Sequence, residues 1–279
     1  LMAIDINLII DKILENDDFL NEKKFILHTP DDKWIRNQLK KSNKVHHEIY
    51  RLFEIYERDC DLILDIGANW GYSINSFRNA GVRTKIVSFE VNPFYDKCLS
   101  AFREIDYRND YLSLGLAKKK LNLTFYFPIL NNNPITALCS QNLNLLRDYS
   151  IYPKEELKSD KFSSLEIYKF EAACFALDEL VAENKKNLFS GRIEGIKLDV
   201  EGQEYDVLMG AKKTINLYRP DIIIENNKNS QLILDLLKTY NYEYFDYIDG
   251  VLHRSSEPSK MINGVFLSQR SKIRKKYAL

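Results

Sequence analysis

Apolar positions recur at two different spacings along the chain. Over residues 1–58 they follow helical spacing, as in Ile6, Ile9, Ile10 and Ile13. From residue 61 onward, short aliphatic runs alternate with amphipathic stretches, which is typical of β-strands alternating with helices. We therefore expect a helical N-terminal extension over 1–58, an α/β domain over 59–269 and a basic tail over 270–279.

The α/β part predicts a mostly parallel sheet that is covered by helices on both faces. We expect the segments 110–116 and 121–127 to pair as a hairpin, and the strand over 262–267 to be antiparallel to the others. Residues 131–169 are polar and aperiodic. A long connection of this kind inside a compact domain favours a lid-like insertion on the substrate side.

Composition narrows the classes of protein. The chain has 279 residues, with 40 basic and 40 acidic side chains, so no net charge attracts nucleic acid. No apolar run approaches the ~20 residues that a membrane span needs. Six acidic residues among the first 24 argue against a secretory signal, and four scattered cysteines indicate reduced thiols. We expect a cytoplasmic protein.

The loop after the first strand of the α/β part reads D-I-G-A-N-W-G-Y-S over residues 65–73. It is neither the dinucleotide pattern G-x-G-x-x-G nor a P-loop. Gly67 and Gly71 permit positive φ and a close approach of the backbone to a ligand. Asp65 could hold a positively charged group. The alternative is a tight strand-to-helix turn that binds nothing.

Acidic residues end several later strands. Glu90 is placed to accept hydrogen bonds from the ribose hydroxyls of an adenosine-type cofactor. A strand ends at Asp199, and Glu201 and Glu204 follow it; carboxylates clustered there suit general-base work or cation binding. Capping of the following helix is the alternative, and it explains Glu204 better than Asp199.

Two further features complete the candidate chemistry. Glu225 and Asn226 follow another strand, and with Asp199 they could bind Mg²⁺ through oxygen ligands. A solvated strand end explains them at least as well. His253 follows a turn at Asp249 and could serve as a base, although a surface role is the simpler interpretation.

Taken together, these patterns resemble the FkbM family of S-adenosylmethionine-dependent methyltransferases. The resemblance spans about 61–267 and is carried by residues 64–73, 88–93, 176–180, 196–204, 207–211, 219–220 and 224–225. Val91 departs from the family's usual F-E-P-x-P, but the acid is kept.

The resemblance implies a class I methyltransferase fold, a Rossmann-like seven-stranded sheet, mostly parallel with an antiparallel last strand. The cofactor would be S-adenosylmethionine, with its methionine part on the glycine loop and its ribose on Glu90. Leu114 and Gly115 would lie near the adenine. The full implied set of cofactor-binding residues is Asp65, Gly67, Asn69, Trp70, Gly71, Tyr72, Ser73, Glu90, Asn92, Leu114, Gly115 and Asp199.

Family members are mostly O-methyltransferases, many of which act on sugars of natural products or surface polysaccharides. Removal of the hydroxyl proton would fall to Asp199 or Glu201, with His253 in reserve. The Mg²⁺ analogy is weakened because Gly202 stands where metal-dependent relatives carry a lysine base.

Other classes stay open. The acceptor could be a protein or a non-sugar small molecule, and the chain could be a non-catalytic cofactor-binding module. The intact acids Asp65, Glu90 and Asp199 argue against the last class. The expected partners are a small-molecule or glycan acceptor and a second copy that pairs through the N-terminal helices.

Overall fold

The structure is a computed structural model that describes residues 45, 47–57, 61–130, 133–134, 139–144, 165–184 and 187–279. Most of the predicted N-terminal extension and most of the predicted insertion lie outside these residues. The chain divides into two compact units. The larger unit comprises 30–121 and 174–279, and the smaller unit includes 122–173.

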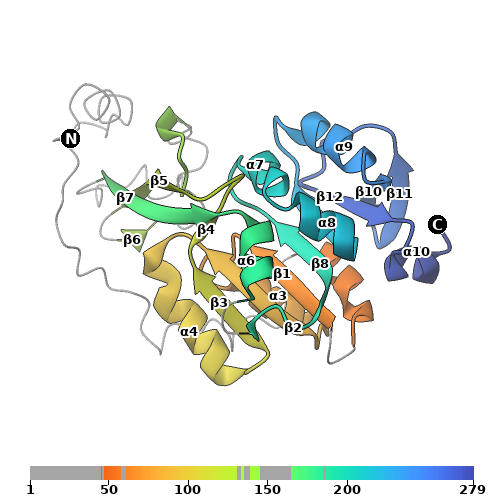
Figure 1. Ribbon diagram of the computed structural model, residues 1–279, viewed down its shortest axis with the longest axis horizontal. Coiled ribbons are helices and arrows are strands. Elements are labelled where there is room, and N and C mark those ends of the chain that lie inside the picture. The colour runs from red at the N-terminus through yellow and green to blue at the C-terminus, as the bar shows by residue number, and fades with distance from the viewer. Residues whose placement is uncertain are drawn as a thin grey trace. The chain divides into compact units, whose positions relative to one another are not determined.

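The larger unit is built on an eight-stranded sheet with the order β11-β10-β12-β9-β8-β1-β2-β3 (Figure 1). The strands are β1 (Asp61–Ile66), β2 (Lys85–Glu90), β3 (Asn109–Ser113), β8 (Arg192–Leu198), β9 (Asp221–Glu225), β10 (Tyr242–Ile248), β11 (Val251–Ser255) and β12 (Asn263–Ser268).

Strand directions confirm the mostly parallel sheet. The neighbours from β3 through β9 pair in parallel, whereas β12 lies antiparallel between β9 and β10. The expected count of seven strands is wrong, because β11 pairs with β10 and adds an eighth strand at the edge. Asp249 and Gly250 both adopt positive φ, and this two-residue turn folds β11 back as a hairpin.

The direction of the strand order reverses between β1 and β8. From β1 the chain builds outward to β2 and β3, and it returns later to place β8 on the other side of β1. In open α/β sheets, ligands bind outside the carboxyl ends of the strands at such a switch point. A ligand site is therefore expected at the carboxyl ends of β1, β2 and β8.

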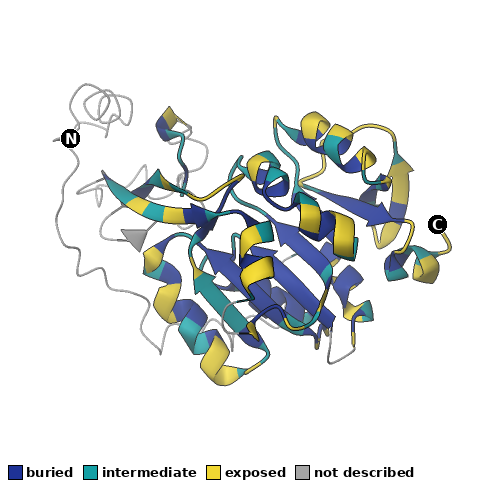
Figure 2. Ribbon diagram, in the orientation of Figure 1, coloured by how far each residue is buried: buried dark blue, intermediate teal, exposed yellow. Residues whose placement is uncertain are grey.

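Helices cover both faces of this sheet, and the strands between them are buried (Figure 2). One face packs Leu64, Ile196 and Ile222 against α6 (Leu177–Glu183), α7 (Glu204–Met209), α8 (Lys212–Tyr218) and α9 (Ser230–Lys238). The other face packs Ile63 and Ile223 against the 3₁₀-helix η2 (Glu48–Ile55), α3 (Tyr72–Asn79) and α10 (Lys272–Tyr277). The helix α4 (Asp96–Ile105) packs beside α3.

Both ends of the described chain pack into the larger unit. Phe53 of η2 is fully buried, so this part of the predicted N-terminal extension belongs to the core of the α/β unit. In the predicted basic tail, Ile273 is fully buried and Lys272 forms ion pairs with Asp61 and Glu194. The tail is therefore a docked helix rather than a solvated end.

A second sheet has the order β4-β7-β5-β6. In the smaller unit, Phe125 of β5 (Leu121–Leu130) stacks on Phe170 of β7 (Leu165–Phe175), with 5.6 Å between ring centroids, and β6 (Asn133–Pro134) pairs with β5. In the larger unit, β4 (Gly115–Leu116) pairs with the last two residues of β7. The predicted hairpin between 110–116 and 121–127 is wrong, because the first segment is divided between β3 and β4, and neither pairs with β5. None of the helices described is long and apolar enough to span a membrane.

Candidate functional site

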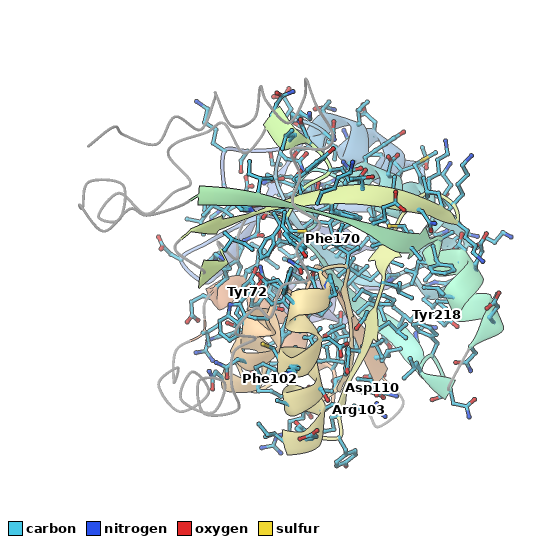
Figure 3. The ribbon with its side chains drawn as sticks, turned by 90° about the vertical axis from the view of Figure 1, so that its left-hand side faces the viewer. Tyr72, Phe102, Arg103, Asp110, Phe170 and Tyr218 are labelled. Atoms are coloured by element: carbon cyan, nitrogen blue, oxygen red, sulfur yellow. The ribbon has the colours of Figure 1, made fainter. Side chains whose placement is uncertain are left out.

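The glycine loop connects the end of β1 to α3, and its two glycines face the protein interior. Gly67 has φ +79°, and a Cβ there would lie 1.7 Å from the backbone oxygen of Asp199. Gly71 has φ +97°, and its Cβ would lie 2.4 Å from the ring of Phe102, which Figure 3 labels. The expected positive φ is confirmed. Both glycines are also required by a close approach to neighbouring parts of the chain.

Glu90 ends β2 and fastens the glycine loop to that strand. Its Oε2 accepts a hydrogen bond from the backbone N–H of Asn69 at 2.7 Å, and its Oε1 accepts one from that of Asn92 at 2.8 Å. Burial raises the pKa of Glu90 to about 7, although the two N–H donors oppose the shift. A carboxylate oxygen accepts more than one hydrogen bond. Both oxygens can therefore still receive hydroxyl donors.

Asn92, beside Glu90, carries a donor with no partner. Its Oδ1 accepts the backbone N–H of Phe94 at 3.1 Å and so begins the short 3₁₀-helix η3 (Pro93–Tyr95). Its Nδ2 is buried and has no hydrogen-bond partner among the described residues. Leaving a buried donor unpaired costs free energy. An acceptor atom of a bound ligand would remove that cost.

Asp65, at the end of β1, is fully buried and therefore faces the interior. Its Oδ2 accepts a hydrogen bond from the Ser73 hydroxyl at 2.6 Å, and its Oδ1 lies 3.5 Å from Nζ of Lys197. The positive group that Asp65 holds is thus an internal lysine. Asp65 and Ser73 stabilise the glycine loop through these internal contacts, and their place in cofactor binding stays a prediction.

Lys197 is the residue that the sequence reasoning missed. Its side chain is 2% exposed, and Nζ donates to the backbone oxygen of Gly67 at 2.6 Å. Burial by itself lowers the pKa of Lys197, but the carboxylates of Asp199 and Asp65 outweigh burial and raise the pKa well above its ordinary value. The signal was present as a lysine among aliphatic residues in the interior of a buried strand.

Asp199 follows β8 and is held by two neighbours, Lys197 and Tyr72. Its Oδ2 lies 3.4 Å from Nζ of Lys197 and accepts a hydrogen bond from the hydroxyl of Tyr72 at 3.0 Å. Tyr72, labelled in Figure 3, is the first residue of α3. Burial, followed by the charge of Asp199, raises the pKa of the Glu225 carboxyl at the end of β9. The side chain of Asp199 remains 21% exposed, so an oriented carboxylate is open to solvent at the strand end.

Glu201 lies two residues beyond Asp199 in a strained turn. It has φ +52°, which is unfavourable for a residue other than glycine, and Gly202 has φ +96°. Burial, followed by the charges of Glu225 and Asp199, raises the pKa of Glu201 to about 8. A carboxyl with this pKa can take up or release a proton near neutral pH.

Glu204 supports that turn from below. It is fully buried, and its Oε1 accepts the backbone N–H groups of Val200 at 2.9 Å and Gly202 at 3.1 Å. Its Oε2 accepts a hydrogen bond from Asn227. The buried carboxylate of Glu204 therefore braces the turn that precedes α7.

The three residues proposed for Mg²⁺ do not converge. Glu225 meets Asp199, and burial followed by the Asp199 charge raises its pKa. Asn226, however, directs Nδ2 to the Tyr244 hydroxyl at 3.1 Å and to the Met261 backbone oxygen at 2.9 Å. In the part of the chain that the structure describes, no three His, Cys, Asp or Glu side chains form a metal-binding group. The residues present do not fit the predicted Mg²⁺ site, and we assign no chemical step to a metal.

The remaining candidates are His253, the adjacent residues Leu114 and Gly115, and Trp70. His253 is exposed on β11, four strand positions from β8, which corresponds to about 19 Å at the usual spacing between strands. His253 therefore lies far from Asp199 and Glu201 at the end of β8. Gly115 is packed so that a Cβ would lie 2.4 Å from Sγ of Cys174, and Leu114 joins β3 to β4. Trp70 is partly exposed beside Tyr72, with 6.2 Å between the ring centroids.

Residues 65–244 match the family model described as the Methyltransferase FkbM domain. The chain belongs to the FkbM methyltransferase family. The matched FkbM domain begins at Asp65 and includes Glu90, Lys197, Asp199 and Glu201. It includes neither η2 nor β11 with His253.

Among solved structures, the chain is similar to methyltransferase FkbM from Methylobacillus flagellatus KT, at 12% identity and a TM-score of 0.43. That alignment covers 93% of this chain but only 58% of the other, so this chain spans less than two thirds of that length. It is also similar to precorrin-6y C5,15-methyltransferase from Geobacter metallireducens GS-15, at 9% identity and a TM-score of 0.37, over 78% of this chain and 83% of the other. These scores are low, and family membership rests on the matched FkbM domain. A search of curated proteins found no match.

Proposed function

We propose that this FkbM-family chain transfers a methyl group from S-adenosylmethionine to a sugar hydroxyl, in a bacterial surface polysaccharide or a glycosylated natural product. The observation that carries the proposal is the arrangement at the switch point. Glu90 and Asn92 lie at the end of β2, on one side of β1 and its glycine loop. Asp199 and Glu201 lie at the end of β8, on the other side of β1.

The residues at the β2 end fit an adenosine. Glu90 presents acceptor oxygens that backbone N–H groups already orient, and Asn92 adds a buried donor without a partner. Ribose hydroxyls donate to carboxylates, and ring nitrogens accept from amides. Trp70 and Tyr72 lie on the loop where the methionine part would be held. S-adenosylmethionine would supply a methyl carbon that its sulfonium already activates.

The residues at the β8 end fit the removal of a proton. A sugar hydroxyl is a poor nucleophile and must lose its proton as it attacks. Asp199 is held by Lys197 and Tyr72, so we assign it to orienting the acceptor hydroxyl. Glu201, with a pKa near the working pH, is assigned as the base. The acceptor oxygen forms a C–O bond as the methyl–sulfur bond breaks, and the acceptor proton passes to Glu201.

Three expectations accompany this proposal. Residues 131–169 form a substrate-side insertion that selects the acceptor, and the N-terminal helices pair two copies of the chain. The third is a cytoplasmic location, which the free thiol of Cys98 supports.

The proposal is tested by methyl incorporation from labelled S-adenosylmethionine into a panel of sugar nucleotides and oligosaccharides. We expect a labelled product that survives mild alkali, as a methyl ether does and a methyl ester does not. Glu201→Gln should lower turnover by about 100-fold or more, because removing a general base costs 10²–10⁴-fold. The matched control Glu257→Gln changes an exposed acid outside the group and should leave turnover unchanged. Labelling of protein, with every sugar left unlabelled, would overturn the assigned acceptor.

A further inference from the structure

The charged group at the switch point stands on the same sheet face as η2. Side chains two apart on a strand point to one face, so Gly195, Lys197 and Asp199 share a side of β8 and its end. Gly195 lies against the Phe53 ring of η2, where a Cβ would be 3.1 Å from the ring carbons. This face of the sheet is therefore apolar where Phe53 covers Gly195, and it becomes charged at Lys197, two residues closer to the end of β8.

A single row of η2 side chains follows this change along the face. Residues three apart align in a 3₁₀-helix, which places Tyr50 and Phe53 in one row, continued by Tyr56 at the end of the helix. The backbone oxygen of Tyr56 accepts a hydrogen bond from Thr84, which precedes β2, whereas Phe53 covers Gly195 inside β8. Thr84 lies before the first register pair of β1 and β2, and Gly195 pairs with β1 beyond that point. The row runs against the strand direction, so Tyr50 is its member nearest the strand ends.

Contacts from other elements place Tyr50 in the same way. It is 1% exposed, and its ring centroid lies 4.7 Å from that of Phe77 in α3, the helix that begins with Tyr72. Burial raises the pKa of the Tyr50 hydroxyl above its ordinary range, and the charges of Lys197 and Asp199 both act on it. The row of η2 side chains and the packing against α3 thus place Tyr50 toward the end of β8, on the sheet face that carries Lys197.

We propose that Tyr50 is a positioning residue of the methyl-transfer site, whose ring closes the inner side of the Lys197–Asp65–Asp199 group and keeps the ammonium dry and fixed on Asp199. The packing stands without the proposed function, whereas the effect on turnover rests on it. The matched FkbM domain begins at Asp65. Tyr50 would therefore bring a segment outside that domain into the site.

The consequence of removing the ring follows from its surroundings. Truncation leaves a cavity beside charged atoms, and a polar cavity of that size admits water. Water raises the local dielectric and weakens the attraction between Lys197 and Asp199. Asp199 would then lose its fixed position, while Glu90 and Asn92 would be unaffected.

The test compares Tyr50→Ala and Tyr50→Leu with Leu52→Ala in the full chain. Leu52 is 3% exposed in the neighbouring row of η2, so its truncation removes apolar packing without opening the side of Lys197. Each variant is treated with acetic anhydride, and acetylation of Lys197 is measured by mass spectrometry, with exposed Lys119 as internal reference. We expect Lys197 to be protected in the wild type and in Leu52→Ala, and to be labelled about tenfold faster in Tyr50→Ala, because labelling follows local opening. Equal labelling in the Tyr50 and Leu52 variants, or unprotected Lys197 in the wild type, would overturn the proposal.

Kinetics provide the second readout. In Tyr50→Ala, kcat should fall about 10- to 100-fold, as misplacement of an aligning group does, while affinity for S-adenosylhomocysteine stays within about threefold. Tyr50→Leu keeps most of the apolar volume and should be intermediate, and it replaces Tyr50→Ala in both measurements if that variant does not fold. Parallel losses of kcat and cofactor affinity would indicate general destabilisation and contradict a positioning role. If the wild type binds no S-adenosylhomocysteine, the proposed function fails, and the acetylation result still decides the position of Tyr50.

Discussion

Nζ of Lys197 lies 3.4 Å from Oδ2 of Asp199, and the two residues stand two positions apart at the end of β8. The same ammonium lies 3.5 Å from Asp65 and donates to the backbone oxygen of Gly67. One buried ammonium therefore connects Asp65 of β1, the glycine loop and the partly exposed Asp199. The site depends on this internal charge as much as on the residues that a ligand would contact.

Replacing Lys197 should destabilise the protein. Lys197→Met leaves the buried Asp65 without its cation, and breaking a buried ion pair in this way typically costs about 3–5 kcal/mol. The exposed control Lys119→Met should change the free energy of unfolding by less than about 0.5 kcal/mol. Urea denaturation gives both values. The double variant Asp65→Asn/Lys197→Met should recover part of the loss. Equal stabilities of Lys197→Met and Lys119→Met would contradict the buried ion pair.

Substitution by alanine should destabilise the protein more at Gly67, in the loop after β1, than at Gly202, in the turn after β8. Gly202→Ala places a Cβ in open space at φ +96°, so only the backbone strain of about 1 kcal/mol is expected. Gly67→Ala has φ +79° and would also bring Cβ to 1.7 Å from the Asp199 carbonyl, which should add about 1–3 kcal/mol or more. Thermal unfolding of both variants measures the difference. Equal losses would show that φ alone requires glycine at Gly67.

Binding of S-adenosylhomocysteine should strengthen as pH rises through about 7, the pKa to which burial raises Glu90. The ionised form accepts hydroxyl donors on both oxygens, whereas protonation below that pH uses one of them. Glu90→Gln should weaken binding by about 10- to 100-fold, or roughly 1.5–3 kcal/mol, and remove the pH dependence. Calorimetry between pH 6 and 8 checks this, with the exposed Glu179→Gln as control. A pH dependence that persists in Glu90→Gln would assign it to another group.

The sequence predicted the strands of the main sheet well, because aliphatic runs such as that of β9 are bounded by acids and turns. It missed β11, whose residues Val251–Ser255 are mostly exposed and lack a buried alternation. It also misplaced β4, because a two-residue strand whose partner, β7, lies far along the chain leaves no local periodicity. Non-local pairing of this kind is set by tertiary packing rather than by pattern.

For the candidate site, chain order revealed the acids at the strand ends but not the direction in which each side chain points. Asp65 and Asp199 look equivalent as acids at strand ends. Asp65 is nevertheless fully buried, whereas the side chain of Asp199 is 21% exposed. The difference comes from Lys197, Ser73 and Tyr72, whose roles depend on packing across β1, β8 and α3. Asn226 and His253 likewise appeared available for chemistry, until pairing of β12 and β11 placed them elsewhere.

The central claim is that the switch point between β1 and β8 binds S-adenosylmethionine. Isothermal titration of the folded protein with S-adenosylhomocysteine tests it most directly. We expect saturable binding at one site per chain in the wild type, kept within about threefold in Asp199→Asn because that residue orients the acceptor rather than the cofactor. Absence of binding to the folded wild-type protein would contradict the account.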